Sequence, residues 1–197
     1  EPSRYTASKL AYDIANRHAD MEDSAWIASV GLIGDMAGRN WPEFLSKVFE
    51  LEKLKPNPHD WFRTTLGEVS EVLLAAMIIE EKNINYCYDA LMKAKSPQDV
   101  LDDKKLRSLR KSFEAEISKW VREAPGLMEK HDNLKLIWYE ISPKYHINSP
   151  VSTMISLNPK YTDWAVLVLE KDKEVIRISG RCQSCRVKMN ELLKESV

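Results

Sequence analysis

Arginine and glutamine gather between residues 174 and 189, in the run EVIRISGRCQSCRVKM. A guanidinium group can hold a phosphate through two parallel hydrogen bonds, and a glutamine amide can reach the edge of a base. The β-branched residues before Gly180 predict a strand on which Arg177, Ser179 and Arg181 share one face. An ordinary solvated strand face explains the same alternation. The candidate nucleic-acid-binding residues are Arg177, Ser179, Arg181, Gln183, Ser184 and Arg186.

Two hydrophobic patterns must position these residues. Up to Pro125-Gly126, the clearest boundary signal, apolar residues recur at helical spacing. After it, short segments in the order β-α-β-β-α predict a small α+β unit. The fold class expected is therefore α+β, with a mostly helical N-terminal part and connector before a small mixed β-sheet with helices. The expected helices are 7–18, one from Ser24, 42–55, 66–82, 86–94, 97–123 with a break near 102–103, one from Ser149, and 188–194; the expected strands are 134–141, 164–169 and 175–181, with a hairpin turn at 171–173.

Several segments of the last third resemble the DHHA1 domain, the C-terminal substrate-binding domain of the DHH phosphoesterase family, which includes RecJ-like single-strand nucleases. The matching segments are LKLIWYEIS from Leu134, SPVSTMIS from Ser149, DWAVLVLEK, and RISGRCQS. Upstream, ASVGLIGDMAG from Ala28 to Gly38 is similar to the last conserved motif of the DHH catalytic domain. The matches occur in the family's order, with a helical connector between them.

The resemblance implies the end of a catalytic domain at 1–40, a helical connector at 41–126 and a DHHA1-like domain, incomplete at its C-terminus, at 127–197. A full family member hydrolyses phosphodiester bonds of single-stranded DNA or RNA, or of short oligonucleotides, with two manganese or magnesium ions. Asp35 matches one of the family's metal ligands, and the segment around Arg181 matches its substrate-facing segment.

The departures from the family bear on activity. No Asp-His-His and none of the other acidic metal motifs occurs in the sequence, which begins at Glu1 and ends before the family's GGGH-type loop. We expect a fragment or a degenerate member that binds nucleic acid, holds no metal pair by itself and is inactive alone. The alternative is a non-catalytic RecJ-like scaffold that binds GINS and the replicative helicase. A third interpretation is an interaction module with Trp61, Phe62 or Phe113 exposed.

Composition limits the kind of binding site and the cellular compartment that can be expected. Formal net charge is -1 over 197 residues, so any nucleic-acid site must be a local patch. Residues 171–197 carry seven Lys/Arg against four acids. Three cysteines are too few for a disulfide framework, and free thiols favour the cytoplasm.

Two further groups of residues could contact nucleic acid. The run of cations from Lys104 to Lys111 is typical of the solvent-exposed side of a helix. Trp41 and Trp61 are the tryptophans placed where a base could stack.

The pair Cys182-x-x-Cys185 allows three interpretations. A structural zinc site needs four ligands, but the remaining cysteine, Cys87, and the four histidines are scattered along the chain. A redox dithiol would lie between a strand and a helix, as this pair does. Two cysteines in a tight turn are the simplest interpretation.

Overall fold

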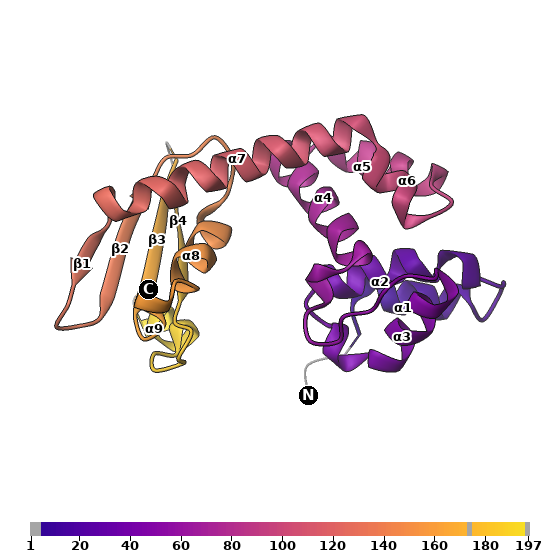
Figure 1. Cartoon of the computed structure of the whole chain (residues 1–197), viewed down its shortest axis with the longest axis horizontal. Helices are drawn as coiled ribbons and strands as arrows, with labels where there is room; N and C mark the ends of the chain where they lie inside the picture. Colours follow the sequence, from indigo (N-terminus) through magenta and orange to yellow (C-terminus); the bar gives the residue numbers. More distant parts are fainter. Residues whose placement is uncertain (1–4, 173–174, 196–197) are drawn as a thin grey trace. The chain divides into compact units, whose positions relative to one another are not determined.

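The computed structural model describes residues 5–172 and 175–195 and confirms an α+β fold (Figure 1). The chain divides into two compact units, Glu1–Lys111 and Ser112–Val197, with the division inside helix α7 (Lys104–Leu127). None of the helices described is both long enough and apolar enough to cross a membrane.

The first unit is helical, and its core forms around α2 and α4. Both helices are apolar on most sides, and their side chains Trp26, Leu32, Leu66 and Val69 are almost fully buried. Its elements are α1 (Ala7–Ala15), η1 (Glu22–Ser24), α2 (Ala25–Gly34), η2 (Gly38–Asn40), α3 (Pro42–Leu51), η3 (Trp61–Arg63), α4 (Thr65–Ile79), α5 (Asn83–Lys93), α6 (Pro97–Asp102) and the start of α7.

Polar side chains decide where these helices begin. The expected break near residue 103 is confirmed, because the Asp103 carboxylate accepts a hydrogen bond from the Leu106 N–H at 2.8 Å and starts α7. The break expected at 83–85 lies instead at 80–82, between α4 and α5. Helix α5 begins at Asn83, whose buried amide donates to the Ala76 carbonyl at 3.0 Å. Ser24 precedes α2, but its side chain makes no capping hydrogen bond.

Helix α7 extends past its expected end at residue 123, through Pro125 and Gly126 to Leu127, after which the first strand begins. A proline inside a helix removes one N–H donor, here the one that would reach the Val121 carbonyl. The loss falls in the last turn, and Met128 closes that turn by donating its N–H to the Ala124 carbonyl at 2.9 Å.

The second unit holds a four-stranded mixed sheet in the order β1-β2-β3-β4 (Figure 1). Strands β2 and β3 are parallel and joined through helix α8, whereas the other two pairs are antiparallel. Strand β1 was not expected, since its Glu-Lys-His sequence is exposed and lacks an apolar pattern. The elements are β1 (Glu129–His131), β2 (Leu136–Ile141), α8 (Asn148–Ser156), η4 (Pro159–Tyr161), β3 (Ala165–Lys171), β4 (Ile176–Arg181) and α9 (Met189–Glu195). The predicted hairpin turn at 171–173 lies partly outside the described residues.

The two faces of this sheet differ. On the inner face, Tyr139 and Val168 are fully buried, and the Tyr139 hydroxyl donates to the Trp120 carbonyl of α7 at 2.9 Å. On the outer face, Ile176 and Ile178 of β4 are 55% and 46% exposed. The apolar residues of β4 thus face outward and its polar residues face inward, the reverse of the usual arrangement.

The exposed aromatic residues expected of an interaction module are not found. Trp61 and Phe113 are 8% and 9% exposed, and Phe62 is half-buried against the core of the first unit. Trp61 is therefore a core residue, which also removes it from the candidates for base stacking.

Candidate nucleic-acid interface

Strand β4 places three of the predicted residues on one face, opposite helix α8. Arg177, Ser179 and Arg181 alternate along β4, and α8 packs against β3 and β4. Helix α8 turns a row of hydroxyl-bearing residues toward them, called here the hydroxyl stripe. The hydroxyl stripe consists of Ser149, Ser152, Thr153 and Ser156, spaced so that they share a helix face.

Arg181 lies across this stripe. Its Nη2 donates to the Ser149 hydroxyl at 3.0 Å, and its Nε donates to the Thr153 hydroxyl at 3.3 Å. Its Nη1 donates to the carbonyl of Gly180 at 2.9 Å. All three acceptors are neutral, and no ion pair to Arg181 is found within the described part of the chain. The half-buried guanidinium therefore keeps its positive charge without a carboxylate partner.

Two further contacts fix the strand and the following turn to the stripe. The buried hydroxyls of Ser179 and Ser152 are 2.9 Å apart and share a hydrogen bond. The Gln183 amide donates to the Ser156 hydroxyl at 2.8 Å. Ser179 is consequently closed to a ligand, whereas Gln183 is exposed and its amide oxygen remains able to accept a hydrogen bond.

Arg177 differs from Arg181 because acids surround it. Its Nη1 lies 3.8 Å from Oε1 of the buried Glu170 and 3.9 Å from Oδ2 of Asp172. That nitrogen is buried and has no hydrogen-bond partner among the residues described. The neighbouring carboxylates offset its charge, so Arg177 is the weaker of the two as an anion-binding group.

The turn beyond β4 carries Ser184 and Arg186, both exposed. Arg186 donates from Nε to the Asp163 carbonyl at 3.3 Å and from Nη2 to the Leu134 carbonyl at 3.2 Å. The Ser184 N–H donates to the Thr162 carbonyl at 3.1 Å. Backbone carbonyls hold Arg186 in place without neutralising it, so this turn presents a second cation.

Asp35 lies in the first unit, exposed at the C-cap of α2. No group of three His, Cys, Asp or Glu side chains that could hold a metal ion is found in residues 5–172 and 175–195. The described residues by themselves thus offer no ligand set for the metal pair that the family resemblance implies.

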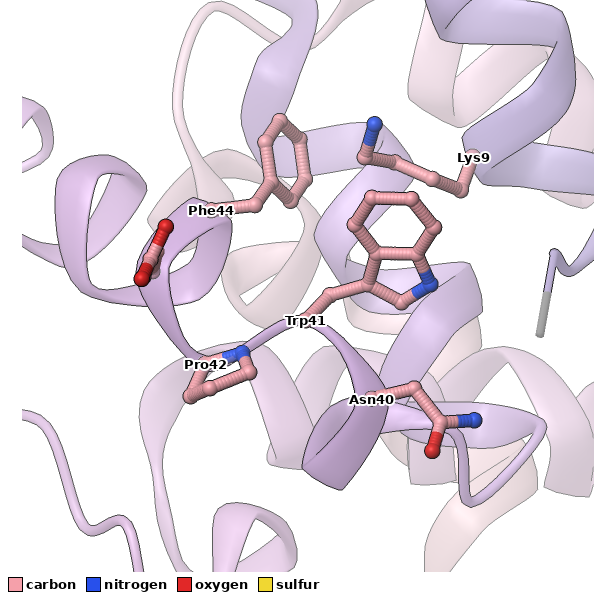
Figure 2. A pocket seen from close by; sticks show the side chains of 6 residues that line it. Lys9, Asn40, Trp41, Pro42 and Phe44 are labelled. Carbon is pink, nitrogen blue, oxygen red and sulfur yellow. The ribbon is translucent and has the colours of Figure 1, made fainter.

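Trp41 does not offer a free stacking surface. Its ring packs against Tyr5 at a tilt of 59°, with ring centroids 4.7 Å apart. The ammonium of the buried Lys9 lies over the Trp41 ring, 4.3 Å from its centroid (Figure 2). Lys9 also pairs with Asp13 at 2.5 Å and lies 4.6 Å from the Phe44 centroid. A cavity of about 420 Å³ opens beside this cluster, lined by Lys9, Asn40, Trp41, Pro42, Glu43 and Phe44. The ammonium of Lys9 therefore already occupies the ring face of Trp41 on which a base would stack.

Sequence reasoning missed the α8 side of the site. Ser149, Thr153 and Ser156 stand four and three residues apart, a helical spacing that was visible in SPVSTMIS. Comparisons with models of protein families, with curated proteins and with solved structures find no match for this chain. Its function must therefore be inferred from the site.

Proposed function

We propose that this chain belongs to a RecJ-like DHH phosphoesterase and that its second unit binds the phosphate backbone of single-stranded nucleic acid. The observation that supports the proposal is the guanidinium of Arg181, held by neutral oxygens of α8 and β4. A phosphate oxygen is a stronger acceptor for a guanidinium than a hydroxyl or a carbonyl is. Ligand phosphate can therefore take the place of the Ser149 and Thr153 oxygens.

The hydroxyl stripe suits the same ligand. Once Arg181 turns to a phosphate, the released hydroxyls of Ser149 and Thr153 can donate to the remaining phosphate oxygens. Ser149 is exposed and Thr153 is half-buried, so both can be reached from solvent. Gln183 and Arg186 extend the polar surface along the turn, which gives a phosphate-binding track rather than a single point.

The net charge of the chain agrees with a binding site made of a few local contacts. With a formal charge of -1, the chain has no overall basic field that would attract nucleic acid over a distance. Affinity must come from a few short contacts, and Arg181 and Arg186 are the cations of the track. In a complete family member, metal-bound water would cleave the phosphodiester bond, with Asp35 among the metal ligands. This chain supplies binding and, by itself, no cleavage.

The test is fluorescence anisotropy of labelled single-stranded DNA and RNA oligonucleotides, measured with the whole chain over a salt series. Arg181→Ala should weaken binding about tenfold, because a charge-assisted contact to phosphate is lost. Arg177→Ala should weaken it less, since acids already offset that charge. Arg39→Ala, an exposed arginine of the first unit, is the control that should change nothing.

Two outcomes would contradict the proposal. One is wild-type chain that binds neither DNA nor RNA at low salt. The other is equal weakening by Arg181→Ala and Arg39→Ala, which would show attraction to any cation. Absence of binding would favour the non-catalytic scaffold, whose partners would be the GINS complex and the replicative helicase.

A further inference from the structure

A second site with its own chemistry lies in the turn that follows β4. Cys182 is half-buried and Cys185 is exposed, and both are free thiols. The Cys185 N–H donates to the Cys182 carbonyl at 3.2 Å, which closes a four-residue turn. Such a turn brings its terminal Cα atoms within about 7 Å, and disulfides span Cα separations of about 4.4–6.8 Å.

The turn is held in shape by contacts outside it. Cys185 has a φ of 55°, in the left-handed region that few non-glycine residues adopt. Ser184 and Arg186 tie the turn to the carbonyls of Thr162 and Asp163 at 3.1 and 3.3 Å. The backbone therefore brings the two cysteines together before any bond forms between them, and little further ordering is needed.

The surroundings of Cys182 favour its thiolate. Burial alone would raise the pKa of the Cys182 thiol, but hydrogen bonds from the Val187 N–H, the Ser184 hydroxyl and the Arg186 N–H lower it, as does the Arg186 charge. Cys87 shows the opposite case. It is 4% exposed in the core of the first unit, and burial raises the pKa of its thiol. Cys87 can therefore serve as the reference thiol within the same chain.

We propose that Cys182 and Cys185 form a reversible disulfide by exchange with a small disulfide such as oxidised glutathione. The Cys182 thiolate attacks one glutathione sulfur, its S–S bond breaks, and one glutathione thiolate leaves. Cys185 then gives its proton to solvent, and its thiolate attacks the Cys182 sulfur, which expels the second glutathione. The two cysteine sulfurs are oxidised, and one glutathione disulfide is reduced to two thiols.

The experiment is mass spectrometry of the whole chain after incubation with oxidised glutathione. Free thiols are blocked with N-ethylmaleimide before trypsin, which releases both cysteines in the peptide 182–186 and Cys87 in the peptide Asn83–Lys93. The expected result is a 182–186 peptide that carries no blocking group and has lost two hydrogen masses. We expect it to form at least about tenfold faster than any adduct on Cys87.

Single variants assign the two roles. Cys185→Ser should accumulate a lasting glutathione adduct on Cys182, which the wild type passes through only briefly. Cys182→Ser should react more slowly and only at Cys185. The proposal is overturned if the 182–186 peptide stays fully blocked, if the wild type keeps a glutathione adduct there, or if either cysteine pairs instead with Cys87 or with a second chain.

Discussion

The carboxylate of Glu170, on strand β3, accepts a hydrogen bond of 2.9 Å from the backbone N–H of Ile147, at the N-cap of helix α8. The same oxygen accepts a second bond of 3.2 Å from the Asn148 N–H, and the other oxygen contacts Nδ1 of His146. One buried side chain thus fixes the start of α8 to the sheet. The helix that carries the hydroxyl stripe is thereby placed opposite Arg181.

Glu170→Gln should destabilise the fold. The glutamine amide keeps one acceptor oxygen, but the substitution removes the negative charge. That charge interacts favourably with the N-terminus of α8 and favours the contact to His146. We expect the free energy of unfolding to fall by about 1–3 kcal/mol, measured by urea denaturation. Glu140→Gln, an exposed carboxylate on the other face of the sheet, is the matched control. Equal effects of the two substitutions would refute the capping role.

Arg181→Lys separates charge from geometry at the candidate interface. Lysine keeps the positive charge but cannot donate two parallel bonds to a phosphate. Affinity for a single strand should fall while the slope of log K against log salt stays as in the wild type. Arg181→Ala should reduce that slope by about 0.7, the value for one lost contact to a single strand. A slope that changes equally in both variants would argue against a phosphate contact at Arg181.

Two glycines should respond in opposite ways to alanine. A Cβ on Gly67 would lie 2.4 Å from the carbonyl oxygens of Trp61 and Phe62, and backbone cannot move aside cheaply. Gly67→Ala should therefore lower the free energy of unfolding by about 1–3 kcal/mol. A Cβ on Gly126, inside α7, would meet nothing within 4 Å, so Gly126→Ala should raise it by about 0.5–1 kcal/mol. Paired thermal and urea unfolding curves would check both signs.

Tyr139 makes the free energy of unfolding depend on pH in the alkaline range. Burial, helped by the charge of Glu123, raises the pKa of its hydroxyl from 10.0 to about 12. Between these values the unfolded chain loses the proton and the folded chain keeps it. The stabilisation is therefore complete below pH 10 and falls as pH rises toward 12. Tyr139→Phe should remove this part of the pH dependence, as urea titrations of both chains at pH 9, 10 and 11 would show.

Lys9→Met should destabilise the first unit, although methionine fits the same space. The substitution removes the Asp13 pair and the contacts of the ammonium with Trp41 and Phe44. Because the Asp13 side chain is 30% exposed and remains partly solvated, the expected loss is about 1–2 kcal/mol. Lys47→Met breaks only an exposed pair with Glu22 and serves as the control. A stable Lys9→Met chain would show that the rings pack as well without the cation.

The sequence predicted well those helices and strands that show a regular apolar spacing. It predicted poorly the elements whose limits depend on polar residues or on pairing with a neighbour. The strands β2, β3 and β4 and the long apolar helix α4 were expected because apolar residues dominate their spacing. Strand β1 was missed because only its pairing with β2 makes it a strand. Asn83 and Pro125 were taken as helix breakers. Asn83 instead forms a buried hydrogen bond at the start of α5. Pro125 is accommodated because it lies near the end of α7.

The candidate site was predicted from one side only. The alternation of Arg177, Ser179 and Arg181 identified a shared strand face, but their differing partners depend on β3 and α8. The acids near Arg177 are five and seven residues away in sequence, whereas the hydroxyls near Arg181 are 28 and 32 residues away. The strand pattern alone does not show that carboxylates lie beside one arginine and neutral hydroxyls beside the other.

The outward-facing isoleucines of β4 bear on how the protein behaves when concentrated. In the sheet as described, β4 is a terminal strand, and Ile176 and Ile178 are about half exposed on it. A terminal strand with apolar side chains is a template for pairing with another chain, which natural proteins counter with charge. Replacing either isoleucine by lysine would leave the inner polar face untouched and should raise solubility in samples prepared for crystallisation or NMR.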